Sequence, residues 1–163
     1  MLTWPHADTD WAPHLPLVEA CYLQIARAIA LREQLLLVCP DENICRTLKR
    51  KLVGLGCPAE RLLFTTSPSH DTWVRDYAPI TVLDNTGPCL KDFSFNGWGG
   101  RYPSALDDRV AAAIARQGCF GQTPLHRLNL VLEGGALDTD GEGSLLATRH
   151  SLLCENRNPD KTP

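Results

Sequence analysis

Segments with the apolar spacing of a helix alternate along this chain with short apolar runs, and this alternation restricts the possible folds more than any other feature. Apolar residues recur at helical spacing from residue 16 to about residue 33, and a strand-like run, Leu35–Cys39, follows. Asp41 is a suitable N-cap for a second helix that would stop at Gly56, and residues 61–65 form the next predicted strand. The first half therefore predicts an α/β fold.

The second half predicts paired strands separated by one more helix. Ser104 is the expected N-cap of that helix, and Gly118 its end. Turn sequences at Asp84–Gly87 and Asp140–Gly143 each separate two strand-like segments, as in hairpins. The predicted elements are strands at 79–83 and 88–95, a helix at 105–117, a strand at 126–132, and strands at 136–140 and 144–148.

The order of these elements repeats a unit made of a helix, a strand and a hairpin. Such a repeat favours blades arranged around an axis, with mixed strand directions, and a plain α/β sandwich is the alternative. The chain begins within an apolar segment and ends at a turn composition, 156–163, so we expect it to be part of a longer protein.

Composition excludes several classes of function. The 163 residues are 44% hydrophobic and have a net charge of −3, with 16 Lys and Arg residues against 19 Asp and Glu residues. Nucleic acid and anionic membrane surfaces are therefore not expected partners. The seven cysteines are widely spaced and contain no Cys-x-x-Cys pair, which argues against a disulfide framework or structural zinc and favours the cytoplasm.

Two carboxylates, an arginine and a tryptophan lie within residues 71–76, shortly before the apolar run 80–83. If this segment is extended, Asp71, Trp73 and Arg75 share one face and Asp76 points to the other. An irregular loop would relax that arrangement. The segment predicts a polar site with a preset carboxylate, and the alternative is that Arg75 and Asp76 pair simply to fasten a loop to a strand.

A second carboxylate stands at the end of a predicted strand. Glu133 follows the apolar segment 128–132 and precedes Gly134 and Gly135. Two glycines at such a position allow a ligand or another backbone segment to approach closely. The alternative is a glycine bulge with an exposed Glu133.

Five motifs together resemble the agmatine deiminase family, which includes the bacterial-type peptidylarginine deiminases. They occur in the family's order and cover nearly the whole chain. They are Thr3–His6, Asp71–Asp76, Phe95–Gly100, Leu132–Gly135 and Glu155–Pro159. The resemblance implies the pentein fold, a five-bladed α/β propeller. Residues 1–163 would form a single incomplete pentein domain of about two blades.

The resemblance also implies the reaction and the residues that carry it. Asp76 is expected to grip a guanidinium group and Glu133 to orient a histidine that transfers protons. Trp73 and Trp98 would wall the channel for the aliphatic tail, with Asn96 nearby, although both tryptophans could instead belong to the core. The family's His-x-Asp motif and nucleophilic cysteine have no counterpart here, because Cys154 precedes a segment that is structural in the family.

The implied activity is hydrolysis of a guanidino group, with agmatine as the expected substrate and N-carbamoylputrescine and ammonia as products. No cofactor or metal is implied. The alternatives are a peptidylarginine deiminase, an amidinotransferase of the same superfamily, and a non-catalytic module that binds a guanidinium or a partner protein. We expect the isolated chain to be inactive and to self-associate through unpaired apolar faces and strand edges.

Overall fold

Two units make up the chain in the computed structural model, which describes residues 1–161. Unit 1 is Met1–Val74 and unit 2 is Arg75–Pro163. Each unit combines helices with a three-stranded sheet, which confirms the predicted mixture of α and β structure. The number of blades and the propeller arrangement stay predictions.

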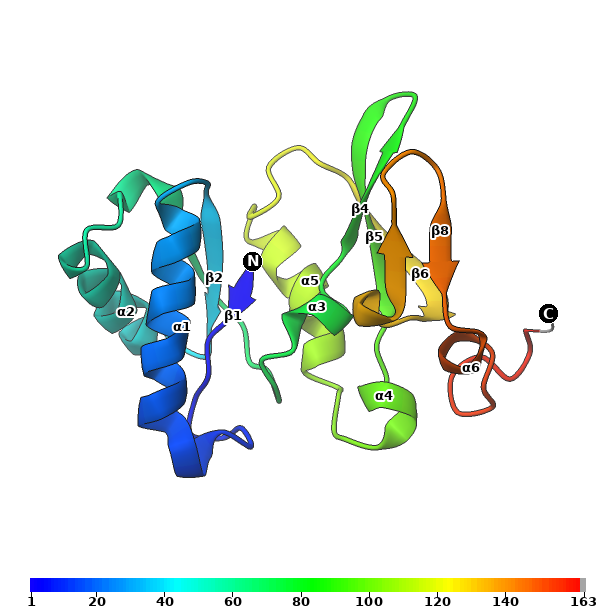
Figure 1. Cartoon of the computed structure of the whole chain (residues 1–163), viewed down its shortest axis with the longest axis horizontal. Helices are drawn as coiled ribbons and strands as arrows, with labels where there is room; N and C mark the ends of the chain where they lie inside the picture. Colours follow the sequence, from blue (N-terminus) through cyan, green and yellow to red (C-terminus); the bar gives the residue numbers. More distant parts are fainter. Residues whose placement is uncertain (162–163) are drawn as a thin grey trace. The chain divides into compact units, whose positions relative to one another are not determined.

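Unit 1 is a parallel sheet with two helices. Its strands lie in the order β1-β2-β3, and the helices lie on one side of the sheet (Figure 1). The central strand, β2, has four of its five residues buried, as is usual for a parallel strand. The elements are β1 (Leu2–Thr3), α1 (Leu15–Ala30), β2 (Leu35–Cys39), α2 (Glu42–Gly54) and β3 (Leu62–Thr66), with short 3-10 helices at Ala12–His14 and Ala59–Arg61.

The ends of α2 form as the sequence predicts. Oδ1 of Asp41 accepts hydrogen bonds from the backbone N–H groups of Asn43, at 2.7 Å, and Ile44, at 2.9 Å. At the other end Gly56 has a φ of +82°, and the N–H of Cys57 bonds to the carbonyl of Leu52 at 3.0 Å. This pattern is a Schellman motif, so Gly56 ends the helix as expected.

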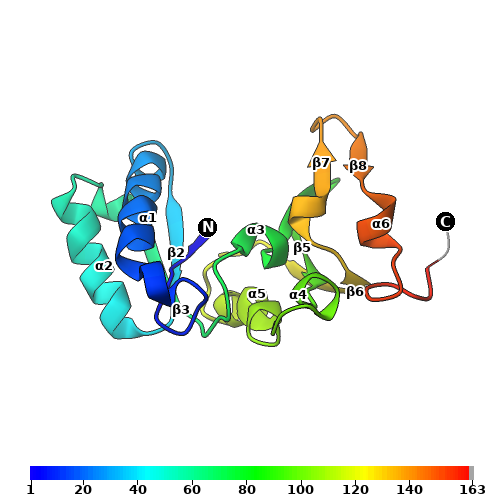
Figure 2. The ribbon, with the colours of Figure 1, turned by 60° about the horizontal axis from the view of Figure 1, so that its bottom comes forward.

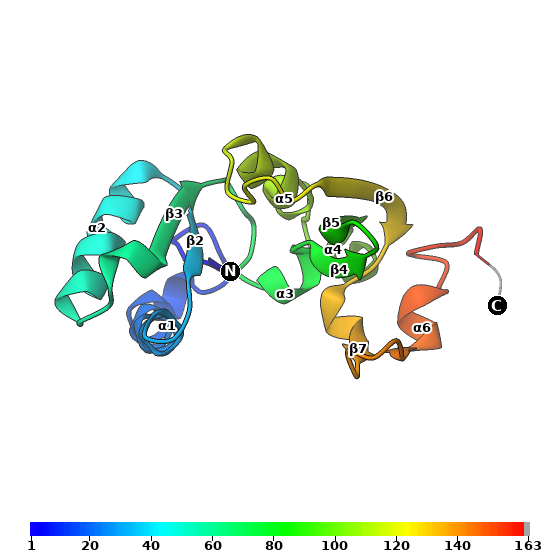
Figure 3. The same ribbon diagram turned by 90° about the horizontal axis from the view of Figure 1, so that it is seen from above.

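Unit 2 has a mixed sheet and a separate hairpin. β5 pairs antiparallel with β4 and parallel with β6, while β7 pairs with β8. α5 runs beside the sheet and α6 follows β8 (Figures 2 and 3). The elements are α3 (Val74–Tyr77, which begins at the last residue of unit 1), β4 (Ile80–Asp84), β5 (Gly87–Ser94), α4 (Gly97–Gly100), α5 (Asp107–Arg116), β6 (Leu125–Val131), a 3-10 helix (Gly134–Ala136), β7 (Leu137–Thr139), β8 (Leu145–Ala147) and α6 (Arg149–Leu152).

An arginine on β6 connects the sheet to α5. Nη2 of Arg127 donates to both carboxylate oxygens of Asp108 at 2.7 Å, and Nη1 donates to Oδ2 of Asp92 at 3.2 Å. Asp108 also accepts a hydrogen bond from the backbone N–H of Phe95 at 2.6 Å. These contacts fix the chain where β5 ends and α4 begins.

The structure excludes one of the possibilities left open for residues 71–76, and it shows that the cap expected at Ser104 is wrong. The segment before β4 is not extended, because Val74–Tyr77 forms one turn of helix, so Arg75 and Asp76 do not alternate across a strand. Ser104 does not cap α5 with its side chain; its carbonyl accepts the N–H of Asp108 at 2.9 Å, and the helix begins at Asp107. In the first turn of α5, Asp108 bonds to Arg127 and to the backbone N–H of Phe95, both distant in sequence.

Within residues 1–161, none of the helices has both the length and the apolar character needed to cross a bilayer.

Candidate active site

The carboxylate of Asp76 is held by two hydrogen bonds from separate parts of unit 2. Oδ1 accepts the backbone N–H of Gly135 at 2.8 Å, and Oδ2 accepts Nε1–H of Trp98 at 2.9 Å. Within residues 1–161, Asp76 forms no ion pair with Arg75, whose Nη2 instead donates to the carbonyl of Leu137 at 3.5 Å. The simple Arg-Asp pairing is therefore excluded, and Asp76 is positioned by a tryptophan and a backbone amide.

The two glycines after Glu133 allow α3 to approach this closely. A Cβ added at Gly134 would overlap the carbonyl oxygen of Arg75, and one added at Gly135 would overlap Oδ1 of Asp76. The predicted close approach at these glycines is confirmed, and the approaching segment is the backbone and side chain of α3. Any larger residue would displace the carboxylate.

Trp98 projects from a left-handed turn. The φ angles of residues 97–100 are 68°, 58°, 83° and 79°, and the N–H of Gly100 bonds to the carbonyl of Asn96 at 2.8 Å. Trp98 is the sole non-glycine residue with positive φ among residues 1–161, a conformation that costs about 1–2 kcal/mol for an L-residue. Edge-to-face contacts with Phe95, at 5.0 Å, and Tyr102, at 5.6 Å between ring centroids, hold the indole in place.

Asn96 stabilises this turn and connects it to the C-terminal segment. Its Oδ1 accepts the N–H of Gly99 at 2.9 Å, and its Nδ2 donates to the carbonyl of Asn156 at 2.7 Å. Both polar groups of the side chain therefore bind backbone atoms of the protein. In this structure Asn96 supports the segment that carries Trp98.

Glu133 is buried, with 4% of its surface exposed, so the alternative of a glycine bulge with an exposed Glu133 is excluded. Nε of Arg157 donates to Oε1 at 2.8 Å and to Oε2 at 3.1 Å. Burial opposes the charge of Arg157, but hydrogen bonds to Cys154 and Glu133, together with the Glu133 charge, raise its pKa. The two side chains thus form a charged pair that is largely shielded from water.

A short C-terminal segment delivers Arg157 to this place. Nδ2 of Asn158 donates to the carbonyl oxygens of Val131 and Leu152, both at 2.8 Å, and Oδ1 accepts the N–H of Val131 at 3.0 Å. Asn158 thereby fastens the segment to the end of β6, directly before Glu133. Nη1 of Arg157 also donates to Sγ of Cys154 at 3.2 Å.

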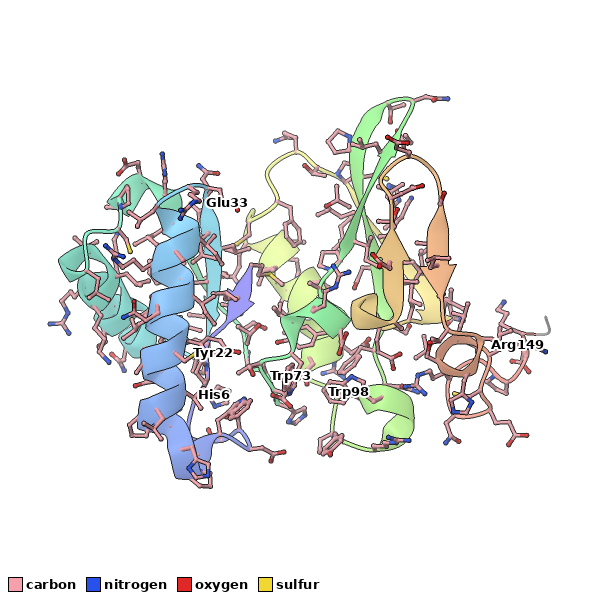
Figure 4. All side chains as sticks on the ribbon, in the orientation of Figure 1. His6, Tyr22, Glu33, Trp73, Trp98 and Arg149 are labelled. Atoms are coloured by element: carbon pink, nitrogen blue, oxygen red, sulfur yellow. The ribbon has the colours of Figure 1, made fainter. Side chains whose placement is uncertain are left out.

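Trp73 belongs to unit 1 and packs against Trp11, with ring centroids 6.2 Å apart. Nε1 of Trp11 donates to Oγ1 of Thr72 at 2.9 Å, which fixes one ring of the pair. Trp73 is 52% exposed, so it is not a core residue. Figure 4 labels both side chains: Trp73 directly precedes α3, and Trp98 lies within α4.

Of the predicted site residues, the structure brings Asp76 and Trp98 into direct contact and places Glu133 two residues before the Gly135 amide. Local sequence does not indicate that Gly135 is a donor to Asp76 or that Arg157 is the partner of Glu133. The segment around Arg157 was noticed only as a family motif. Its Arg-Asn pair carries a usable signal, because Arg157 donates to the buried Glu133 and Asn158 donates to two backbone carbonyls.

The arrangement suits a cation better than an anion. A carboxylate has about four acceptor positions. The protein uses one on each oxygen of Asp76, which leaves one on each for an external donor. Among residues 1–161, no three His, Cys, Asp or Glu side chains converge in a way that would hold a metal ion.

Several known proteins similar to this chain are agmatine deiminases. An agmatine deiminase from Stutzerimonas stutzeri is 31% identical over 97% of this chain and 42% of its own length. A structure of agmatine deiminase from C. jejuni with substrate bound has a TM-score of 0.84 at 30% identity, covering 98% of this chain and 45% of that one. The agmatine deiminase of Enterococcus faecalis has a TM-score of 0.80 at 28% identity, covering 99% of this chain and 43% of that one.

This chain therefore spans less than half the length of the relatives it resembles. The sequence model of the Porphyromonas-type peptidyl-arginine deiminases matches residues 1–163, which is the whole of this chain. Agmatine deiminases are similar to this chain in both sequence and structure. Because the family model matches the whole chain, the chain belongs to the Porphyromonas-type peptidyl-arginine deiminase family.

Proposed function

We propose that this chain is part of an enzyme that hydrolyses a guanidino group, with agmatine as substrate and N-carbamoylputrescine and ammonia as products. The observation that carries the proposal is the Asp76 carboxylate, which two N–H donors hold in one orientation while an acceptor position stays open on each oxygen. The agmatine deiminases among its relatives support the substrate class.

Asp76 would bind the substrate's guanidinium. That group is planar and always charged, and its N–H donors form a fixed fork that matches the two oxygens of a carboxylate. Because Trp98 and Gly135 already fix the plane of Asp76, binding would require little further ordering of this side chain. We propose that Trp98 borders the aliphatic tail of the substrate and that Asn96 supports Trp98. A substrate contact of Trp73, which lies in unit 1, stays a prediction.

The proposed chemistry needs a thiolate from a part of the enzyme outside this chain. The thiolate attacks the guanidinium carbon, ammonia leaves with a proton supplied by a histidine, and a covalent amidino-thioether remains. Water, deprotonated by the same histidine, then releases the ureido product and the thiol. Glu133 would orient that histidine, and the reaction requires neither a metal nor another cofactor.

The experiment is ammonia release by the full-length gene product, with agmatine and a peptidyl-arginine offered separately. We expect turnover of agmatine and its loss in Asp76→Asn, since the amide is neutral and can no longer balance the guanidinium charge. Glu142→Gln, in the exposed turn between β7 and β8, is the matched control for one lost negative charge. Normal turnover by Asp76→Asn, or no ammonia from any guanidino substrate, would exclude the proposal.

A second candidate is guanidinium binding without catalysis. It is favoured by the position of Asp76 and its two donors, which all lie within unit 2 of this chain. Titration calorimetry of agmatine into the 163-residue chain tests it, since heat of binding without ammonia release would identify a binding module. A preference for peptidyl-arginine, or transfer of the amidino group to an amine, would point to the other members of the superfamily. A cytoplasmic location and self-association of the chain stay predictions.

A further inference from the structure

The contact between Arg157 and Glu133 joins a residue of the proposed mechanism to a segment that the mechanism does not use. Glu133 stands after β6, and Arg157 lies 24 positions further along, beyond the β7–β8 hairpin and α6. Both Oε atoms lie within 3.1 Å of Nε of Arg157, and the two side chains are 5% and 14% exposed. A carboxylate this deeply buried is stable only with a compensating charge.

The segment around Arg157 is built to deliver that charge. Asn158 makes three hydrogen bonds, two of them to the backbone of Val131, which fixes the segment against β6 next to Glu133. The carbonyl of Asn156 accepts the side chain of Asn96 from the left-handed turn. Arg157 is thus held on both sides by contacts to the elements that carry Trp98 and Glu133.

The turn also leaves room for the guanidinium of Arg157. A Cβ added at Gly99 would lie 3.0 Å from Nη1 of Arg157, closer than a side chain normally approaches. The absence of a side chain at Gly99 therefore admits the arginine. Segments at residues 96–99, 131–133 and 156–158 all meet around one ion pair, which is more than a surface contact requires.

We infer that Arg157 is the positioning residue of Glu133: it balances the buried charge of Glu133 and fixes its carboxylate in the orientation that the proposed reaction uses. The inference rests on the proposed function for the role of Glu133, but the ion pair itself can be tested without any activity. The Asn156–Asn158 segment then serves the reaction site by holding Arg157 against Glu133.

Charged and titratable residues lie near this pair on two segments, α3 and the turn that follows α6. Arg75 and Asp76 approach from α3 through their contacts with Gly134 and Gly135, and Cys154 accepts a hydrogen bond from Arg157. Among residues 1–161, the salt bridge to the Glu133 carboxylate comes from Arg157. Its removal leaves the buried Glu133 carboxylate without a compensating charge.

The test uses Arg157→Gln in the 163-residue chain and measures unfolding in urea at about pH 5 and about pH 8. The indole N–H signal of Trp98 in NMR reports on unit 2, because the other three tryptophans lie in unit 1. We expect Arg157→Gln to lower the ratio of folded to unfolded protein at least about tenfold more at the higher pH. Arg116→Gln, on the exposed part of α5, should lower it equally little at both.

Two further variants separate positioning from simple packing. Glu133→Gln combined with Arg157→Gln should lose the pH dependence, because no buried carboxylate remains, and Arg157→Lys should recover most of the stability at the higher pH. An equal loss at both pH values, or no recovery with lysine, would overturn the inference. If Arg157→Gln does not fold, the lysine variant and the double variant still decide.

In the full-length protein, Arg157→Lys should lower kcat for agmatine at least about tenfold with little change in KM, since the lysine restores charge but not the orientation of Glu133. An unchanged kcat would overturn the positioning role. Absence of deiminase activity in the unmodified protein would instead remove the proposed function, while the unfolding data would still establish the ion pair.

Discussion

Nε1 of Trp98 lies 2.9 Å from Oδ2 of Asp76, so the residue with the least favourable backbone conformation in unit 2 holds the carboxylate of the candidate site. Backbone strain of this kind persists only where surrounding contacts enforce it. Here those contacts are the rings of Phe95 and Tyr102 and the hydrogen bonds of Asn96. We therefore interpret the strained turn as a device that holds Trp98 where it can bind the Asp76 carboxylate.

Trp98→Phe should lower the free energy of unfolding by about 1–2 kcal/mol, because the aromatic contacts remain and the hydrogen bond to a charged group is lost. Urea denaturation followed by circular dichroism measures the effect. In a double-mutant cycle with Asp76→Asn, the two losses should not add. Fully additive losses would show that the hydrogen bond contributes nothing.

Gly134→Ala should destabilise unit 2 by about 1–3 kcal/mol, because the added methyl group overlaps the backbone carbonyl of Arg75, which cannot rotate away. Gly54→Ala, in the last turn of α2, is the matched control. A Cβ there meets nothing within 4 Å, so the change should be neutral or should stabilise the protein by up to about 1 kcal/mol. Thermal unfolding of both variants checks this, and equal melting temperatures would contradict the close approach.

The cysteines should differ strongly in reactivity. Cys21 is exposed, whereas Cys39 and Cys45 are buried, and burial raises the pKa of both buried thiols. Since the thiolate is the reactive form, iodoacetamide should alkylate Cys21 at least about tenfold faster than Cys39 at neutral pH. Peptide mass spectrometry over time gives the order, and denatured protein is the control in which all seven should react alike. Early modification of Cys39 would contradict the core of unit 1.

Asp92 should make the folded state less favourable as the pH rises. Burial raises the pKa of this carboxyl, and the neighbouring Arg127 only partly offsets that effect. The folded protein therefore keeps the proton to higher pH than the unfolded chain, so the stability from this group is present at low pH and lost as the pH rises through the titration of the folded carboxyl.

Asp92→Asn removes that titration. Relative to this variant, the wild-type protein should be more stable in acid than at neutral pH, and urea unfolding of both proteins at several pH values measures the difference. A difference that is constant with pH, or that grows in favour of the wild type as the pH rises, would contradict the raised pKa.

Local sequence rules were sufficient for α2. Asp41 and Gly56 act through bonds to residues within a few positions, so the ends of the helix are specified by the segment itself. The order of helices, strands and hairpins was also readable, because each element has its own apolar spacing. The start of α5 was not, since contacts of Asp108 with Arg127 and Phe95, distant in sequence, decide it.

The candidate site was only half readable. The two acids, Asp76 and Glu133, were identified through family motifs and their glycine neighbours. What holds them was not, because the donors come from residues 22 and 24 positions away and from one backbone amide. A composition of three glycines and one tryptophan fits many loops, and nothing local predicts that all four residues take the left-handed conformation.

The mirror-image winding at residues 97–100 leaves one position, 98, at which substitution can change a side chain. Three of the four positions carry no side chain at all, so variation that preserves the backbone can alter the group presented to Asp76 mainly at position 98. Substituting Trp98 would change the hydrogen-bond donor beside Asp76 while the backbone of the loop stays as it is.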